Sequence, residues 1–283
     1  MTAYGSGKPS GLQSALENAC TNCHATALTL ARQFITFKPI VRTFYCSGQN
    51  AMLFRQFFDN TSSTYTYLIA SGRGREALII DPVKEYTQAY LDIINQLDLR
   101  LVRAIDTHTH ADHFTALGDL RDETDCITTM GEFTNADCVS EQVSEGDRID
   151  VDGIRLEALY TPGHTDESFS FYWKKGDQQA VFTGDVLLIR GSGRTDFQGG
   201  DPHKSYDSIV NKLFRLPDDT LVYPAHDYKG MLSSSIYEEK HYNPRLAGKS
   251  EAEYVQIMND LNLPDPKLMD VAVPANLACG KQP

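Results

Sequence analysis

The sequence predicts an α/β protein, and three observations support this fold class. Short apolar runs bounded by turn residues recur from about residue 51 onward, as expected for buried strands. One longer segment between two such runs carries apolar residues at helical spacing instead. Several of the runs end almost directly at a His or an Asp, so that polar side chains gather at strand ends. At 283 residues, the chain is long enough for one large α/β domain or two small ones.

The predicted elements follow one another in chain order. A strand at 66–70 is followed by one at 77–80 that ends in Asp81-Pro82, and then by a helix over about 84–97. Four apolar residues of that helix would share one face: Tyr90, Ile93, Ile94 and Leu97. Further strands are predicted at 101–105, 154–160, 168–173, 180–182 and 220–223.

Composition excludes two classes of function. A net charge of −12 argues against binding to nucleic acid, because contacts to phosphates need a basic face. Since no run of about 18 apolar residues occurs, we expect no membrane span and a soluble protein. The cysteines are few and irregularly spaced, which gives no sign of a disulfide framework and favours a reducing compartment. They lie at positions 20, 23, 46, 126, 138 and 279.

The first fifty residues differ from the rest. They hold four basic residues against the single acid Glu17, together with ten Ser or Thr, whereas the remainder has 22 basic and 37 acidic residues. This composition is typical of an organelle transit peptide, and the alternative is a disordered or partly helical extension. We therefore expect an N-terminal extension over 1–50 and one domain over 51–283.

A haem-attachment motif also occurs within that extension. Cys20-Thr21-Asn22-Cys23-His24 has the C-x-x-C-H spacing that holds c-type haem, with the His as axial ligand. No apolar export signal precedes it, although this chemistry needs one. A chance match is the alternative, and an electron carrier or haem protein is accordingly the least favoured function.

The densest group of chemically active side chains follows the strand at 101–105. His108, His110, Asp112 and His113 lie within six residues, and they include three of the eight His in the chain. A loop at a strand end can turn several side chains toward one point while the sheet holds it in place. The alternative, a polar loop of hydrogen-bonded histidines, would leave this density unexplained.

Three later segments repeat the design. Each ends a predicted strand with one potential ligand, and Pro or Gly beside it makes the turn. They are Thr161-Pro162-Gly163-His164, Thr183-Gly184-Asp185 and Tyr223-Pro224-Ala225-His226. Together with the first group they predict a metal site built from separate loops at one edge of a sheet. His203 and His241 lie in predicted helical or charged stretches and are expected at the surface.

The order of these ligands resembles that of the metallo-β-lactamase superfamily, which implies an αββα sandwich of two mixed sheets flanked by helices. From about residue 53 to 280 the chain is similar to the persulfide dioxygenases, also called sulfur dioxygenases or the ethylmalonic encephalopathy protein family. The motifs that carry this narrower resemblance are Gly-Asp-Val-Leu-Leu-Ile-Arg-Gly at 184–191, Gly-Arg-Thr-Asp-Phe-Gln at 193–198, Tyr-Pro-Ala-His-Asp-Tyr at 223–228, Asn-Pro-Arg at 243–245 and Val-Pro-Ala-Asn at 273–276.

The resemblance implies a metal centre and a reaction. One Fe(II) per chain would be held by His108, His164 and Asp185, a two-His, one-carboxylate set that leaves coordination positions open. Glutathione persulfide, O₂ and water would give sulfite and glutathione, a step of sulfide catabolism. Four further residues either support these ligands or complete a two-metal site as in related zinc hydrolases. They are His110, Asp112, His113 and His226.

Substrate binding is also implied by the resemblance. Arg194, Tyr228 and Arg245 would bind the glutathione part, since an Arg fork suits a carboxylate, and the alternative for each Arg is a structural salt bridge. Cys279 lies near the C-terminal motif, either close to the site or as a buried inert thiol. A homodimer and a separate sulfurtransferase partner are further expectations. The location expected is the mitochondrial matrix if 1–50 is a eukaryotic transit peptide, and otherwise the cytoplasm.

A hydroxyacylglutathione hydrolase of the glyoxalase II type is the main alternative. It uses the same ligand types with two metals to cleave a thioester, and it would normally add a longer helical C-terminal region. Only about 38 residues follow Arg245 here, and they include Pro264, Pro266 and Pro274, which limit helix length.

Overall fold

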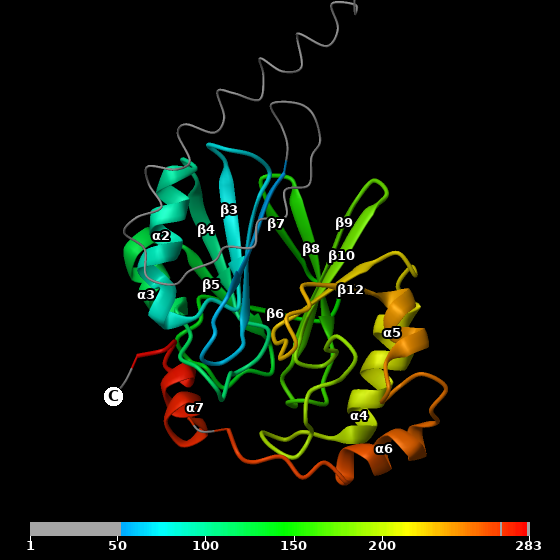
Figure 1. Cartoon of the computed structure of the whole chain (residues 1–283). Coiled ribbons are helices and arrows are strands. Elements are labelled where there is room, and N and C mark those ends of the chain that lie inside the picture. Colours follow the sequence, from blue (N-terminus) through cyan, green and yellow to red (C-terminus); the bar gives the residue numbers. More distant parts are fainter. Residues whose placement is uncertain (1–51, 267, 282–283) are drawn as a thin grey trace, which may run out of the picture. The chain divides into compact units, whose positions relative to one another are not determined.

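The computed structural model describes residues 52–266 and 268–281, and their strands form two mixed sheets that face each other (Figure 1). The predicted extension over 1–50, with its Cys20 to His24 motif, lies outside the described residues. In the described part of the chain, each sheet has six strands. This confirms the predicted α/β class with two mixed sheets.

The first sheet contains the N-terminal strands, ordered as they occur in the chain. Its early strands pair antiparallel, and β3 to β6 are parallel. The strands are β1 (Leu53–Phe58), β2 (Tyr65–Ala70), β3 (Glu76–Ile80), β4 (Arg100–Ile105), β5 (Ile127–Gly131) and β6 (Glu141–Val143). Because β3 and β4 are parallel, their carboxyl ends, at 81 and 106, lie at the same edge.

The second sheet contains the strands of the second half of the chain, in the order β12-β11-β10-β9-β8-β7. The neighbours β10 and β11 are parallel, and the other neighbouring strands are antiparallel. The strands are β7 (Arg148–Val151), β8 (Ile154–Tyr160), β9 (Phe169–Lys175), β10 (Gln178–Gly184), β11 (Leu221–Pro224) and β12 (Ser234–Ser235). The parallel pair again brings two carboxyl ends, at 185 and 225, to one edge.

Helices lie on the outer side of each sheet. Figure 1 shows α2 and α3 beside the first sheet and α4 and α5 beside the second. The helical elements are η1 (Lys84–Tyr86), α2 (Thr87–Gln96), α3 (Leu117–Thr124), α4 (Pro202–Tyr206), η2 (Asp207–Lys212), η3 (Leu213–Arg215), α5 (Ile236–Tyr242), α6 (Glu251–Asn259) and α7 (Met269–Leu277). None of the helices in the described part is long and apolar enough to span a membrane.

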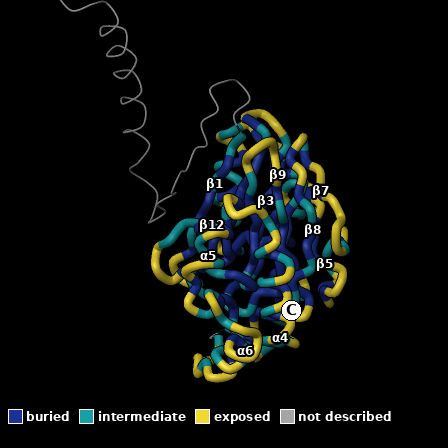
Figure 2. Tube along the Cα trace, turned by 90° about the vertical axis from the view of Figure 1, so that its right-hand side faces the viewer, coloured by how far each residue is buried: buried dark blue, intermediate teal, exposed yellow. Residues whose placement is uncertain are grey.

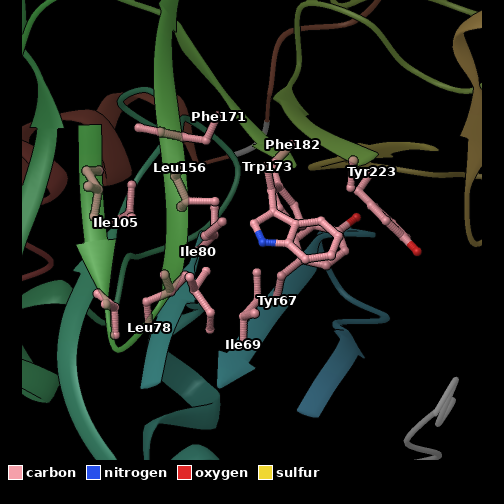
Figure 3. Packing of buried hydrophobic residues seen from close by; sticks show 14 of the residues in the cluster. Tyr67, Ile69, Leu78, Ile80, Ile105, Leu156, Phe171, Trp173, Phe182 and Tyr223 are labelled. Carbon is pink, nitrogen blue, oxygen red and sulfur yellow. The ribbon is translucent and has the colours of Figure 1, made fainter. Parts of the chain in front are cut away.

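The main core lies between the two sheets, where side chains of both inner faces meet (Figure 3). Tyr67 of the first sheet packs on Phe182 and Tyr223 of the second, with ring centroids 5.1 and 5.5 Å apart. The residue before each of these two aromatic residues points to the opposite face of the second sheet, so Val181 and Val222 join a second core under the outer helices. The central strands are therefore buried on both faces, as the dark interior of Figure 2 shows. Such a packed scaffold holds the loops at its edge in place.

Most sequence-predicted elements are confirmed. The predicted strands agree with β2, β3, β4, β8, β9, β10 and β11 to within a few residues. The helix predicted at 84–97 begins as the short 3₁₀ turn η1 and continues as α2, with Tyr90 and Ile94 buried. The pattern missed five strands, namely β1, β5, β6, β7 and β12.

The cysteine spacing gave no sign of a disulfide framework, but the structure contains a disulfide. Cys138 and Cys279 form a disulfide across 141 residues of sequence, while Cys126 is free and buried. Spacing along the chain could not show this pairing, because only the fold brings the end of α7 to the loop between β5 and β6. Cys279 is therefore not the inert thiol that the sequence allowed.

Candidate metal centre

The ligand-bearing loops meet at one edge of the sandwich. His108 follows β4, His164 follows β8, Asp185 follows β10 and His226 follows β11. The turn into Asp185 depends on Gly184, whose φ of +52° is unfavourable for other residues. A side chain at this position would also clash, because its Cβ would lie 2.7 Å from Thr107 Oγ1. The sheet ends thus deliver four side chains to one place.

His108, His164 and Asp185 form a first cluster. Each offers one ligand atom, and these atoms lie within 4.8 Å of one another. The two imidazole rings are nearly perpendicular, with centroids 5.0 Å apart, and His164 Nε2 lies 3.6 Å from Asp185 Oδ2. Two nitrogens and one carboxylate on one face are the donor set of non-haem Fe(II) centres.

Hydrogen bonds set the orientation of both rings. His164 Nδ1 donates to the carbonyl oxygen of Arg194 at 2.7 Å, because a carbonyl can only accept. Thr107 Oγ1 donates to Asp81 at 3.1 Å, so its oxygen accepts from His108 Nδ1 at 2.9 Å. Both rings therefore keep the Nε2 lone pair for a metal, and the residues fit such an ion.

His110, Asp112 and His113 form a second cluster beside the first, with ligand atoms again within 4.8 Å of one another. Among the described residues, His110 Nδ1 and His113 Nε2 are buried without a hydrogen-bond partner. Asp112 Oδ2, in contrast, lies near several donors: His226 Nε2 at 2.8 Å, His113 Nδ1 at 3.2 Å and Thr64 Oγ1 at 3.3 Å. This oxygen is already well satisfied without a metal.

His226 links the two clusters. Its Nδ1 donates to Asp185 Oδ1 at 2.6 Å, and its Nε2 to Asp112 Oδ2 at 2.8 Å. Burial opposes a charged imidazole, yet these two carboxylates raise the pKa of His226 well above its usual value. Burial likewise opposes ionisation of Asp185, but His226 holds the pKa of that carboxyl far below its usual range. His226 thus connects the carboxyl groups of the two clusters through its two ring nitrogens.

Arg194 and Arg245, both predicted to bind substrate, differ in their contacts. The Arg194 guanidinium donates to both carboxylate oxygens of Asp196, at 2.7 and 2.8 Å, and to the carbonyls of Leu263 and Pro264. Arg245 uses Nη1, which donates to Ser192 O at 2.5 Å and approaches Ser192 Oγ at 3.3 Å. Within the described residues, Nε and Nη2 of Arg245 make no hydrogen bond.

Tyr228, the third predicted substrate residue, lies beside the metal loops. Its ring stacks on that of His226 with an interplanar angle of 5° and centroids 6.0 Å apart. The side chain is 71% exposed, so its hydroxyl is open to a bound molecule. His203 and His241, in contrast, are exposed, as predicted.

Known proteins similar to this chain point to one family. A model of the metallo-beta-lactamase superfamily matches residues 139–226. Persulfide dioxygenase ETHE1, mitochondrial, of Mus musculus is 44% identical over 82% of this chain and 90% of its own length. The crystal structure of ETHE1 from Myxococcus xanthus is 53% identical over 81% of this chain and 100% of its own, with a TM-score of 0.77. The chain belongs to the persulfide dioxygenase family.

A more distant likeness confirms the fold. A metallo-beta-lactamase structure from Staphylococcus aureus is 26% identical over 81% of this chain and 73% of its own, with a TM-score of 0.74. The metallo-β-lactamase fold with two mixed sheets and flanking helices, expected from the order of the ligands, is therefore correct.

Two buried acids support the loop of residues 106–115 that follows β4, which we call the metal loop. Neither acid was identified as a site residue from the sequence. Asp81 accepts from the amide of Thr107 at 2.7 Å and lies 3.2 Å from His110 Nε2, and burial raises its pKa to about 6. Glu167 accepts from the amide of Thr109 at 2.7 Å, and burial raises its pKa to about 7. Asp81 directly follows a predicted strand, as the proposed ligands do, and this position could have indicated a role in the site.

Asn276 is a third supporting residue that the sequence did not identify as part of the site. Its Nδ2 donates to the carbonyls of His110 and His113, each at 2.8 Å, and its Oδ1 accepts from Thr115 N at 2.9 Å. The residue belongs to the Val-Pro-Ala-Asn motif at 273–276, so the signal was present, but no local pattern connects α7 to the metal loop.

Proposed function

We propose that this chain is a non-haem Fe(II) persulfide dioxygenase that oxidises glutathione persulfide. The reaction consumes one persulfide, one O₂ and one water, and it yields sulfite, glutathione and two protons. Both atoms of O₂ join the terminal sulfur, water supplies the third oxygen, and the sulfur–sulfur bond breaks. The relatives named persulfide dioxygenase, similar over most of their length, carry this proposal.

The first cluster is the proposed iron site. His108, His164 and Asp185 would hold one Fe(II), which supplies open coordination positions for O₂ and for the terminal sulfur. The chain's own contribution is orientation. Backbone and hydroxyl acceptors hold the two rings with Nε2 toward the ion, and His226 holds one oxygen of Asp185 so that the other faces it.

We assign a supporting role to the second cluster. A second ion bound by His226 and Asp112 would have to displace the contact between His226 Nε2 and Asp112 Oδ2, and it would compete with His113 Nδ1 for the same oxygen. The partnerless nitrogens of His110 and His113 are suited to ordered water near the iron. Hydroxyacylglutathione hydrolysis is also disfavoured by the C-terminal helices, because α6 and α7 have nine residues each.

Substrate binding would use the residues outside the clusters. Arg245 has two uncommitted donor groups for a glutathione carboxylate, and the exposed hydroxyl of Tyr228 can donate to a second acceptor. Arg194 already holds Asp196, so a substrate carboxylate would have to replace that partner. A mitochondrial location, a homodimer and a separate sulfurtransferase remain predictions, and only the first has support, because the mammalian relatives are named mitochondrial.

Metal reconstitution with an oxygen electrode tests this function. The metal-free chain is loaded anaerobically with Fe(II) or with Zn(II) and mixed with glutathione persulfide in air-saturated buffer. We expect oxygen uptake with Fe(II) alone, with one sulfite formed per O₂ consumed. A chain that binds two zinc ions, hydrolyses lactoylglutathione and takes up no oxygen with either metal would show that the hydrolase alternative is correct.

A further inference from the structure

The C-terminal helix α7 holds the metal loop through one side chain. Asn276 binds three backbone groups of residues 110–115, which carry the second cluster. Asn276 and its three partners are all buried. The position of α7 therefore determines how closely residues 110–115 are held, although α7 contributes no ligand.

A disulfide ties the end of α7 to the first sheet. Cys279, three residues after Asn276, is bonded to Cys138 in the loop before β6. Cys279 has a φ of +54°, a left-handed conformation that is unfavourable for a residue other than Gly. Its carbonyl accepts from Gly118 N at 3.1 Å, so α3 keeps this residue in place from the other side. The crosslink therefore helps to hold a backbone turn that the sequence alone does not favour.

The two cysteines of this bond differ in exposure. Cys279 is 0% exposed, whereas Cys138 is partly exposed. Arg121 donates to the carbonyl of Cys138 at 2.6 Å and places a cation beside it. An anionic thiolate from solution can therefore approach the sulfur of Cys138, but not that of Cys279.

We propose that the Cys138–Cys279 bond is a thiol-exchange site for low-molecular-weight thiols, and that its state controls how firmly α7 holds the metal loop. A thiolate attacks the sulfur of Cys138, forms a mixed disulfide with it and releases the thiolate of Cys279. A second thiolate then attacks the mixed disulfide and frees Cys138, and the two small thiols leave as one disulfide. Two thiols thus supply the two electrons that reduce the protein bond.

The consequence lies in the metal loop. Once the bond is open, Cys279 and the end of α7 lose their covalent link to the first sheet and are held only by hydrogen bonds and packing, so Asn276 binds residues 110–115 less firmly. Groups that orient metal ligands indirectly change metal affinity by about 10- to 100-fold when they are lost. Naming glutathione as the thiol rests on the proposed function, in which it is the product, but the exchange chemistry does not.

The full-length protein tests this with readouts that do not depend on dioxygenase activity. The chain is kept oxidised or is reduced with a phosphine, and alkylation with mass spectrometry reports the state of Cys138 and Cys279. Amide hydrogen exchange over 108–116 and Fe(II) affinity by chelator competition are then measured. We expect faster exchange in this segment and Fe(II) affinity lower by up to about tenfold after reduction.

Two variants complete the test. Cys138→Ser cannot form the bond and should behave like the reduced protein under all conditions, whereas Cys126→Ser should keep the full response to reduction. Glutathione should open the bond by adding first to Cys138. Equal exchange and equal affinity in the two states, or alkylation of both cysteines in the oxidised protein, would overturn the proposal. Failure of oxygen uptake alone would instead count against the proposed function.

Discussion

The two histidine clusters use the same residue types, but the groups that accept a hydrogen bond from their imidazole rings differ. In the first cluster, His108 and His164 donate to neutral acceptors, a threonine hydroxyl and a backbone carbonyl. In the second, His110 and His113 donate toward the carboxylates of Asp81 and Asp112. His226, between the clusters, donates to a carboxylate on each side.

This difference indicates how neighbouring loops divide the work at one sheet edge. A ring held by a neutral acceptor presents a lone pair to a metal at little electrostatic cost, and the single carboxylate of Asp185 supplies the charge. In the second cluster, His110 Nδ1 and His113 Nε2 have no partner among the described residues, but His226 Nε2 and Asp112 Oδ2 already pair at 2.8 Å, and a second ion would have to break that contact. We therefore keep the proposal of one metal, with the second cluster in a supporting role.

The largest expected effect comes from comparing the loss of a proposed metal ligand with the loss of a residue that supports the ligands. His108→Ala removes a proposed ligand and should lower Fe(II) affinity and activity by at least about a thousandfold. His226→Ala removes an indirect support and should lower Fe(II) affinity by about 10- to 100-fold. Chelator competition and metal analysis measure both, with the exposed His203→Ala as the matched control.

The comparison fails if the two histidines behave alike. Equal losses, together with a fall from two metals to one in His226→Ala, would make His226 a ligand of a second ion. Retention of one iron per chain in both the native protein and His226→Ala would support the division of roles.

The sequence allowed the proposed metal ligands to be predicted, but not the acids that support them. His108, His164 and Asp185 each follow an apolar run, and strands of one sheet that run in the same direction have their carboxyl ends at a common edge, so their convergence could be expected. The supporting acids could not be separated from surface acids by sequence. Glu167 lies in Thr-Asp-Glu-Ser, which is typical of an exposed turn, and only the fold buries it under the loop.

The fold shows the same limit. β3, with a continuous apolar run, and β8, which begins with apolar residues at alternate positions, were predicted because burial leaves a local pattern. β1 was missed because Arg55 and Gln56 interrupt its apolar residues, and β6 and β12 are too short to show any period. Contacts between distant segments, such as Asn276 with the metal loop, have no local pattern at all.

The two arginines give the next largest effect. Arg245→Ala removes free donors, and since a hydrogen bond to a charged group contributes about 1.5–3 kcal/mol, KM for glutathione persulfide should rise about 10- to 100-fold with kcat little changed. Arg194→Ala removes a guanidinium already paired with Asp196, so KM should rise less than about tenfold. Steady-state oxygen uptake measures both, with Arg245→Lys as the variant that keeps the charge but loses the fork. A larger effect at Arg194 would show that Asp196 gives way to substrate.

The smallest effect concerns Glu167, which supports the loop between the clusters. Its pKa is raised from 4.5 to about 7, chiefly by burial, so the folded protein binds this proton more tightly than the unfolded chain. The stability linked to that proton is fully present below about pH 4.5 and is lost as pH rises through about 7. Glu167→Gln keeps an acceptor for the Thr109 amide without a titrating proton, so its stability relative to the native protein should rise with pH.

Urea unfolding with a chelator present, from pH 4.5 to 8, measures this without a contribution from metal release. The relative gain should level off above about pH 7 at no more than about 3 kcal/mol. Glu123→Gln, which removes one charge at an exposed site, should show no such trend. A Glu167→Gln curve parallel to the native one would mean that Glu167 is already ionised in the folded protein. Donors around the loop, beginning with the Thr109 amide, would then stabilise its charge.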